Sequence, residues 1–142
     1  MIVQKNVNNN FQKAKPSVGF IGLGVMGHRM LANMTTHGGF NVARAWDPDR
    51  QACELVKQNY AEIEISKTAE DLVSDREVEV VYIASPPAFH HAHALSAAAA
   101  GKTIYCEKPL GVNIASSNEM VDAVESTGVL NVVNFPFADS QP

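Results

Sequence analysis

VGFIGLGVMG, residues 18–27, is the stretch from which the expected structure follows most directly. An apolar run ends at Gly22, and Gly22, Gly24 and Gly27 form the pattern G-x-G-x-x-G, followed at once by a helical segment, residues 28–37. In such a loop the first glycine permits a tight turn, the second lets a phosphate approach the backbone, and the third lets the helix pack against the strand. The free N–H groups and the positive end of the helix dipole then face the phosphates. The stretch therefore predicts a binding site for the pyrophosphate of a dinucleotide.

The length and composition of the chain limit the classes of protein to consider. Its 142 residues suffice for one domain with a core, but not for two full domains. The net charge of −4 gives no attraction to nucleic acid or to an anionic membrane, so neither is expected as a partner. Cys53 and Cys106 have neither metal-ligand nor redox spacing, which favours reduced thiols, no metal and a cytoplasmic protein. Residues 1–15 are polar, lack the apolar core of a signal peptide and are expected to form a disordered tail.

Apolar segments alternate with helical ones from residue 16 to residue 137, which we expect to form one dinucleotide-binding domain. Strands are expected at residues 17–22, 42–47, 62–66, 78–84, 102–106 and 130–135, and helices at residues 25–37, 49–59, 89–100 and 113–126, with a short helix after Thr68. This alternation implies right-handed crossovers and an α/β fold. Six strands with the glycine pattern after the first predict a Rossmann-type, doubly wound, mostly parallel sheet in the order 3-2-1-4-5-6. Residues 138–142 are expected to lead out of the domain.

Asp47 is the first candidate for contact with a ligand outside the glycine loop. It closes the second expected strand, 20 positions after Gly27. A carboxylate there accepts hydrogen bonds from the adenosine ribose and repels a 2′-phosphate, which favours NAD over NADP. The alternative is a helix N-cap, because Asp47-Pro48 fits a cap with proline at the first helical position. Arg50 leaves NADP open, since it either pairs with a 2′-phosphate or is solvated on the helix face.

A second candidate segment, SPPAFH, follows the fourth expected strand and contains Ser85, Pro86 and His90. Ligands of open α/β sheets bind at the switch point between strands 1 and 4, where this segment lies. His90 either faces the cofactor cleft or makes a structural hydrogen bond. His91 and His93 are assigned to structural roles, and the spacing of the three histidines does not place them on one helical face, so no zinc site is expected.

A third candidate segment, residues 105–110, follows the fifth expected strand and contains Glu107 and Lys108. A lysine in a partly desolvated cleft can bind a substrate hydroxyl and help to move its proton. The alternative is a surface turn with two solvated charges, which the residues alone favour.

The glycine pattern and the segments around the fourth and fifth expected strands together resemble the Gfo/Idh/MocA oxidoreductase family. The resemblance rests on Pro86-Pro87-x-x-His90, then AAGK at residues 99–102, then CEKPL at residues 106–110, in this order after the glycine pattern, and covers residues 17–137. Family members are NAD(P)-dependent enzymes that act mostly on sugars, polyols and related hydroxy compounds. The resemblance therefore implies an NAD(P)-dependent oxidoreductase whose substrate is a sugar, polyol or cyclitol.

The resemblance also implies roles for individual residues. The pyrophosphate would be held by Gly22, Gly24, Val25, Met26 and Gly27, the ribose by Asp47, and the cofactor cleft would be lined by Ser85, Pro86 and His90. Glu107 would lie beside the nicotinamide ribose, Lys108 would be the catalytic lysine near the nicotinamide, and Asn134 would lie near the nicotinamide as well.

The family pattern includes a second domain, with a catalytic His, most substrate contacts and a homo-oligomer interface. The sequence stops where that domain is expected to begin, and residues 134–137, NFPF, lack the usual Arg-Phe pair. We therefore expect cofactor binding with little turnover, whether the chain is a fragment, a truncated product or a stand-alone module.

Three other classes of protein share part of this pattern. Residues 19–30 resemble the start of β-hydroxyacid dehydrogenases, but those enzymes have no Glu-Lys-Pro after the fifth strand. A Rossmann-type methyltransferase also has an acid after the second strand, but its loop is usually G-x-G-x-G. A non-catalytic dinucleotide-binding sensor or scaffold remains the main alternative. The sequence does not define the substrate.

Overall fold

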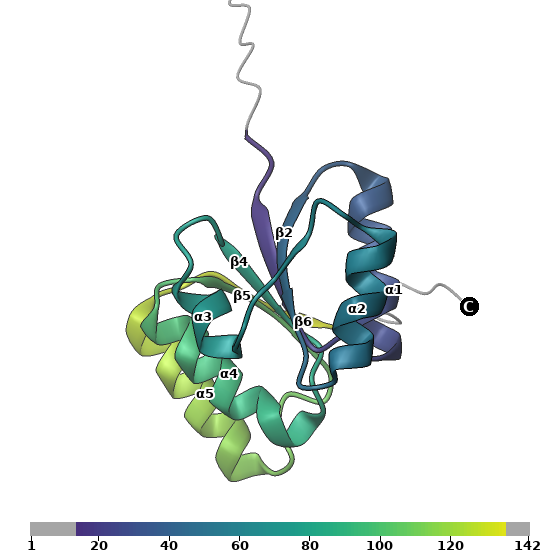
Figure 1. Ribbon diagram of the computed structural model, residues 1–142. Helices are drawn as coiled ribbons and strands as arrows, with labels where there is room; N and C mark the ends of the chain where they lie inside the picture. The colour runs from purple at the N-terminus through teal and green to yellow at the C-terminus, as the bar shows by residue number, and fades with distance from the viewer. Residues whose placement is uncertain (1–13, 136–142) are drawn as a thin grey trace, which may run out of the picture.

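A computed structural model describes residues 14–135 as a six-stranded sheet covered by helices on both faces (Figure 1). The strands are β1 (Ser17–Ile21), β2 (Asn41–Trp46), β3 (Glu64–Ile65), β4 (Val80–Ile83), β5 (Thr103–Glu107) and β6 (Asn131–Asn134). Their order is β3-β2-β1-β4-β5-β6 and every neighbouring pair is parallel. The predicted Rossmann-type order is confirmed, and the sheet is entirely rather than mostly parallel. The predicted exit at 138–142 and all but the last two residues of the predicted tail lie outside the described residues.

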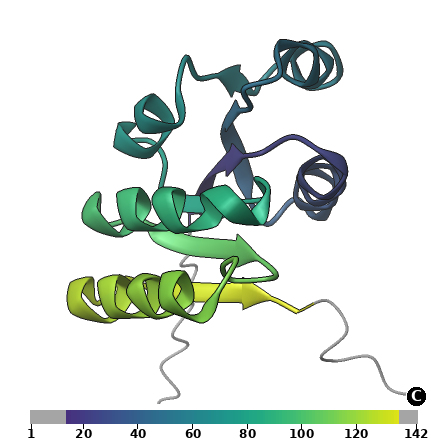
Figure 2. The same ribbon diagram turned by 90° about the horizontal axis from the view of Figure 1, so that it is seen from below.

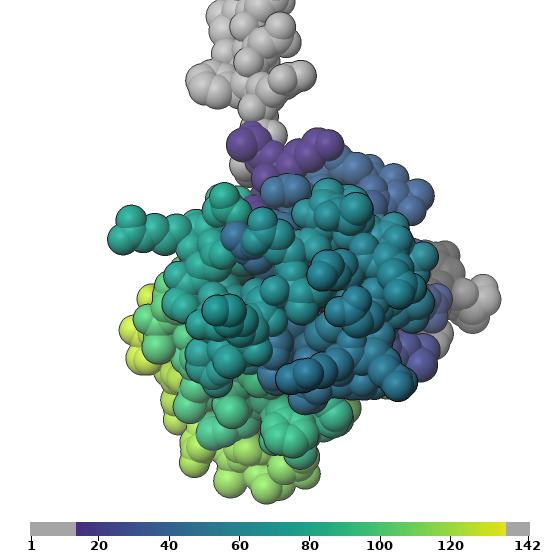
Figure 3. All heavy atoms as spheres, in the orientation of Figure 1, coloured from purple at the N-terminus to yellow at the C-terminus, as the bar shows by residue number. Residues whose placement is uncertain are grey.

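The helices form a layer on each side of the sheet, as Figure 2 shows. Helices α1 (Val25–His37) and α2 (Arg50–Asn59) cover one face, and α3 (Ala69–Ser74), α4 (Pro87–Ala99) and α5 (Ile114–Thr127) cover the other. In the space-filling view, the green and yellow surface of α4 and α5 lies at the lower left, away from the blue of α1 and α2 (Figure 3). This division of helices is what right-handed crossovers produce when the chain runs outward from β1 in both directions.

Two apolar cores correspond to the two layers. Side chains of β1 alternate between them, so that Phe20 packs with the α1–α2 layer and Ile21 with the α3–α5 layer. Leu31 of α1 and Leu72 of α3 are fully buried on opposite sides. Full burial of one leucine side chain contributes about 2 kcal/mol to the stability of the fold, so apolar burial stabilises both layers.

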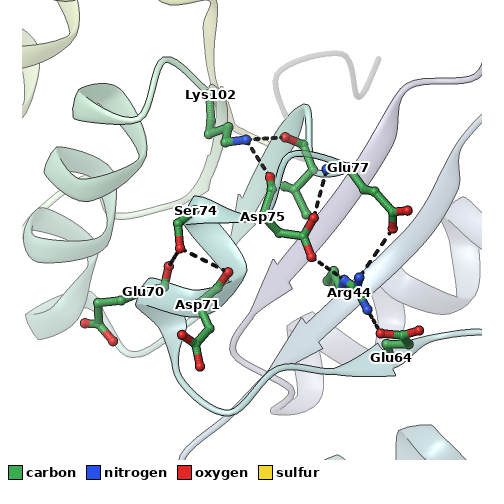
Figure 4. Close-up of polar contacts among 9 residues, drawn as sticks. Arg44, Glu64, Glu70, Asp71, Ser74, Asp75, Glu77 and Lys102 are labelled. Carbon is green, nitrogen blue, oxygen red and sulfur yellow. Dashed lines mark hydrogen bonds and ion pairs between the residues drawn. The ribbon is translucent and has the colours of Figure 1, made fainter.

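An ion-pair cluster around Arg44 joins β2 to its neighbours (Figure 4). The Arg44 guanidinium bonds the Asp75 carboxylate at 2.7 Å, contacts Glu77 at 3.3 Å and pairs with Glu64 of β3. Lys102 Nζ donates to the main-chain oxygen of Asp75 at 2.7 Å. A hydrogen bond from the Glu77 N–H and the Arg44 guanidinium lower the pKa of Asp75. The cluster fixes the loops that precede β4 and β5, which lie at the opposite ends of these strands from the glycine loop.

Candidate functional site

A cavity of about 610 Å³ opens at the carboxyl ends of the strands, where β1 and β4 are neighbours. It lies at the switch point at which open α/β sheets bind ligands. The loops after β1, β2 and β4, the first turn of α1 and the first two turns of α4 supply its walls. Its lining residues are Gly22, Gly24, Val25, Met26, Trp46, Asp47, Pro48, Ala84, Ser85, Pro86, Phe89 and His93.

The glycine loop forms the part of the wall next to α1. Gly22 has a φ of +97°, and a Cβ there would lie 2.4 Å from Ser85 N, so both its conformation and its surroundings require glycine. A Cβ at Gly27 would lie 2.0 Å from Gly22 O, whereas a Cβ at Gly24 would meet no atom within 4 Å. Gly24 is the N-cap of α1 and no side chain caps this helix. The loop therefore presents free N–H groups and open space toward the cavity, as an anion requires.

Asp47 links the glycine loop to the segment after β2. Its Oδ2 accepts a hydrogen bond from the N–H of Leu23 at 2.7 Å, and its Oδ1 accepts one from the N–H of Asp49 at 2.8 Å. The N-cap of α2 is Asp49, which accepts from the N–H of Gln51, so the cap interpretation of Asp47 is wrong. Each carboxylate oxygen has a second acceptor position, which leaves this fixed carboxylate able to accept from ribose hydroxyls.

Ser85, Pro86 and His90 lie in or beside the turn between β4 and α4. Ser85 lines the cavity, and its Oγ is buried without a hydrogen-bond partner among residues 14–135. His90 is 1% exposed, with Nδ1 at 2.9 Å from Pro109 O and Nε2 at 2.7 Å from Ser85 O. It does not line the cavity. The geometry therefore corrects the predicted place of His90 and supports its structural alternative, because the ring joins two loops through main-chain oxygens.

Glu107 is the centre of a hydrogen-bonded group at the ends of β4, β5 and β6. It is 5% exposed, and its Oε1 accepts bonds from the hydroxyl of Tyr82 and from Nδ2 of Asn134, the latter at 2.6 Å. Tyr105 Oη donates to Asn134 Oδ1 at 3.4 Å. Burial, followed by the Glu107 carboxylate, raises the pKa of Tyr82. The interpretation of Glu107 as a solvated surface charge is wrong, and the structure brings it together with the predicted Asn134.

Lys108 follows β5 directly and its side chain is exposed. The peptide bond to Pro109 is cis. Among residues 14–135 the Lys108 ammonium forms neither an ion pair nor a hydrogen bond. The structure therefore places a free primary amine next to the buried Glu107, outside the cavity that holds the glycine loop.

Three aromatic residues of the cavity wall were missed by the sequence reasoning. Trp46, Phe89 and His93 all line the cavity, and the rings of Trp46 and His93 meet edge to face with centroids 6.1 Å apart. His93, assigned to a structural role from the sequence, thus lies at the cavity in contact with Trp46. A usable signal was present, because Phe89 and His93 are four residues apart on one helix and Trp46 directly precedes Asp47.

A metal centre and a membrane-spanning helix are both absent from the described part of the chain. Residues 14–135 contain no group of three or more His, Cys, Asp or Glu side chains able to hold a metal ion. Within the same residues, no helix has both the length and the apolar character needed to cross a bilayer.

The sheet order, the glycine loop and the cavity at the switch point define a dinucleotide-binding domain of the Rossmann type. Residues 17–135 match the Gfo/Idh/MocA family, described as an oxidoreductase family with an NAD-binding Rossmann fold. The chain therefore belongs to the Gfo/Idh/MocA oxidoreductase family and comprises its NAD-binding domain.

Individual relatives support the same family and show how much of it the chain covers. An inositol 2-dehydrogenase from Agrobacterium fabrum is 33% identical over 114 residues, which are 78% of this chain and 34% of that protein. A trans-1,2-dihydrobenzene-1,2-diol dehydrogenase from Oryctolagus cuniculus is 48% identical over 60 residues, 42% of this chain and 18% of that protein. The crystal structure of a myo-inositol 2-dehydrogenase from Lactobacillus plantarum has a TM-score of 0.81 and 25% identity, covering 89% of this chain and 39% of that one. The chain thus spans about a third of the length of the full-length relatives that it matches.

The residues of the cavity fit an NAD molecule. Gly24 leaves open space beside the uncapped N-terminus of α1, where a pyrophosphate needs to approach the backbone. Ser85 is a lining residue, and its buried Oγ is a polar atom without a hydrogen-bond partner among residues 14–135. Asp47 follows the end of β2, with Oδ2 bound to the N–H of Leu23 in the glycine loop and Oδ1 bound to the N–H of Asp49.

Proposed function

We propose that the chain is the cofactor-binding part of an enzyme that transfers a hydride between NAD(P) and a hydroxyl-bearing carbon of a sugar, polyol or cyclitol. The observation that carries the proposal is the cavity that joins the glycine loop, Asp47 and Ser85 at the switch point of the sheet. The similar proteins named for inositol and for a dihydrobenzene diol support the substrate class, because both names denote ring compounds with adjacent hydroxyl groups.

In this proposal, residues at one end of the site bind the cofactor and residues at the other end assist the reaction. The uncapped N-terminus of α1 binds the pyrophosphate, Asp47 accepts from the adenosine ribose, and Ser85 supplies a hydroxyl to the wall between them. When bound, the nicotinamide supplies or accepts the hydride. Lys108 donates a hydrogen bond to the reacting oxygen and helps to move its proton. Glu107, fixed by Tyr82 and Asn134, orients the loop that carries Lys108.

Asp47 favours NAD over NADP in this proposal, because its carboxylate is held at the ribose position by two main-chain N–H groups. A 2′-phosphate placed against it would bring like charges together. The substrate is a small molecule, and the net charge of −4 supports neither nucleic acid nor an anionic membrane as partner.

Calorimetric titration of the chain with NAD and NADH tests cofactor binding, and a panel of polyols and cyclitols tests turnover. In a polypeptide that turns over, Lys108→Ala is expected to lower kcat by about 100-fold or more, as the loss of a group that moves a proton does. NAD affinity should change little, because Lys108 does not line the cavity. Lys57→Ala, on the exposed last turn of α2, is the matched control and should leave both quantities unchanged.

Three results would contradict the proposal. Failure of NAD and NADH to bind would remove the cofactor role and with it the enzyme class. A Lys108→Ala variant that loses NAD binding while keeping its turnover number would show that Lys108 supports the fold of the loop rather than the reaction. Binding without turnover on any hydroxy compound, in a polypeptide as long as the relatives, would favour the non-catalytic sensor or scaffold.

A further inference from the structure

The glycine loop borders a second cavity besides the one at the switch point. This second cavity, of about 400 Å³, lies between the N-terminal halves of α1 and α2. Gly24 and Val25 line both cavities, whereas Leu23 and His28 line the second and not the first. The loop therefore separates two spaces, and each of its main-chain groups can point toward one or the other.

Both main-chain polar groups of Leu23 are held by side chains. Its N–H donates to Asp47 Oδ2 at 2.7 Å, and its carbonyl oxygen lies 2.5 Å from Nδ1 of His28. The main-chain N–H of His28 donates to the carbonyl oxygen of Gly24 at 2.9 Å. His28 thus holds two successive carbonyl groups of the loop, one through its ring and one through its backbone.

The surroundings of the His28 ring define where its proton lies. Because the carbonyl oxygen of Leu23 can only accept a hydrogen bond, Nδ1 carries a proton. Nε2 is enclosed and has no hydrogen-bond partner among residues 14–135. A proton on Nε2 would be buried without an acceptor, which is unfavourable. The ring is therefore neutral, with Nδ1 as its donor.

The peptide unit between Leu23 and Gly24 relays this hydrogen bond to the other side of the loop. Among residues 14–135 the only cis peptide bond precedes Pro109, so the unit is trans. In a planar trans unit the C=O and the following N–H point in opposite directions. Since the carbonyl of Leu23 is turned toward His28, the N–H of Gly24 points away from His28. This N–H has no acceptor within the described part of the chain.

We propose that His28 is a positioning residue of the cofactor site, which aims the N–H of Gly24 at the pyrophosphate by holding the carbonyl of Leu23 from the far side of the loop. This inference rests on the proposed function, because it needs a pyrophosphate in the cavity at the switch point. His28 does not line that cavity, so it acts on the ligand only through the loop. The G-x-G-x-x-G pattern ends at Gly27, so the histidine is an addition to the pattern and not a part of it.

The physical effect of this hydrogen bond is preorganisation of a main-chain donor. If the carbonyl of Leu23 were free, the plane of the peptide unit could rotate, and the N–H of Gly24 would have to be reoriented when a ligand binds. Ordering a group on binding reduces affinity, and fixing it beforehand restores that affinity. Loss of the His28 donor is therefore expected to weaken binding of a pyrophosphate ligand about 5-fold.

Two substitutions separate the hydrogen bond of the ring from its packing. His28→Leu keeps apolar bulk without a donor, whereas His28→Asn keeps an N–H at the position of Nδ1. In calorimetric titrations with NAD and with ADP, His28→Leu should bind about 5-fold more weakly, and His28→Asn within about 2-fold of the unchanged chain. His37→Leu, the same replacement in the last turn of α1, is the matched control and should bind as the unchanged chain does.

Nuclear magnetic resonance of the 142-residue chain adds two measurements that a purely structural role of His28 would not change. Addition of ADP should shift the amide proton resonance of Gly24 in the unchanged chain and in His28→Asn, but much less in His28→Leu. The nitrogen resonances of the His28 ring in the unchanged chain should show a protonated Nδ1 and an unprotonated Nε2. This last measurement needs no variant.

The inference is overturned if the His28 ring carries its proton on Nε2, or if His28→Leu binds NAD as tightly as the His37→Leu control. It is also overturned if His28→Leu and His28→Asn lose affinity equally, or if ADP shifts the Gly24 resonance equally in both. In each of these cases NAD binds to the unchanged chain, and the proposed function stands. If the unchanged chain binds neither NAD nor ADP, the proposed function fails and the inference fails with it.

Discussion

Replacing Gly27 by alanine should lower the stability of the fold without placing a group in the path of the ligand. Replacing Gly24 by alanine should leave the stability almost unchanged and weaken ligand binding. A Cβ at Gly27 would lie 2.0 Å from Gly22 O and 2.9 Å from Gly22 C, so the helix and the loop have to separate by about 1 Å. Overpacking against backbone costs about 3 kcal/mol, and the better helix propensity of alanine returns about 1 kcal/mol. The expected loss is about 2 kcal/mol, or a fall in Tm of about 8 °C.

Gly24→Ala is the matched comparison for this prediction. A Cβ at Gly24 meets no atom within 4 Å and the residue has a φ of −69°, which any residue adopts, so stability should change by less than about 1 kcal/mol. The methyl group would occupy the space through which a pyrophosphate approaches the N–H groups of α1, so NAD affinity should fall at least about 10-fold. Thermal unfolding and calorimetric titration of both variants give the two numbers. Equal Tm values, or NAD binding that survives Gly24→Ala, would refute the reasoning.

Further predictions concern charge and pH. Arg44→Met should lower the free energy of unfolding, measured in urea, by about 2 kcal/mol, because the partly buried guanidinium holds three carboxylates. Arg44→Lys should have a stability between those of Arg44→Met and the unchanged chain. Unchanged stability in both variants would contradict this prediction. Burial, and then the nearby Glu107 carboxylate, raises the pKa of the Cys106 thiol from its ordinary 9.0 to about 12. In the folded chain this thiol should therefore resist a thiol reagent at about pH 8. Its contribution to stability should fall as the pH rises from 9 toward 12, because the thiol of the unfolded chain ionises first. Desolvation lowers the pKa of His93 from its ordinary 6.5, with Glu70 of α3 opposing and His90 of α4 adding to the effect. The contribution of this imidazole to stability should therefore fall as the pH is lowered below 6.5, because the unfolded imidazole binds a proton first. Urea denaturation of the chain and of His93→Phe at several pH values measures this, and an equal pH dependence in the two would contradict it.

Most of the fold follows from the sequence because each strand and helix carries its own apolar period. The expected first helix, residues 25–37, has the observed bounds of α1. Differences occur where a tertiary contact sets the end of an element. β3 pairs with β2 through Glu64 and Ile65 alone, so it is shorter than the five residues expected. α4 begins at Pro87, two residues earlier than expected, because proline needs no N–H bond at the first helical position.

The site could be predicted only where its residues are close in sequence or belong to a known pattern. The glycine loop needs nothing beyond its own spacing, and its geometry follows from three glycines. The two hydrogen bonds of Asp47 join β2 to a loop 24 residues earlier, so an N-cap was equally consistent with the local sequence. The buried state of Glu107 depends on the register that sets Tyr82 beside Tyr105 on β5 and Glu107 beside Asn134, which no local signal contains.

In the proposed function, the hydrogen bonds of the site make cofactor binding and reaction separable. Asp47 is held by the N–H groups of Leu23 and Asp49, and Glu107 by Tyr82 and Asn134, so the two ends of the site share no polar partner. A substitution at one end of the site should therefore leave the geometry of the other end unchanged, because the effects of substitutions at sites without shared partners add. Asp47 lines a cavity with its own walls, whereas the Lys108 side chain is exposed among residues 14–135. The proposed hydride transfer requires a site from which water is excluded, so the proposal requires Lys108 to be shielded by residues outside 14–135.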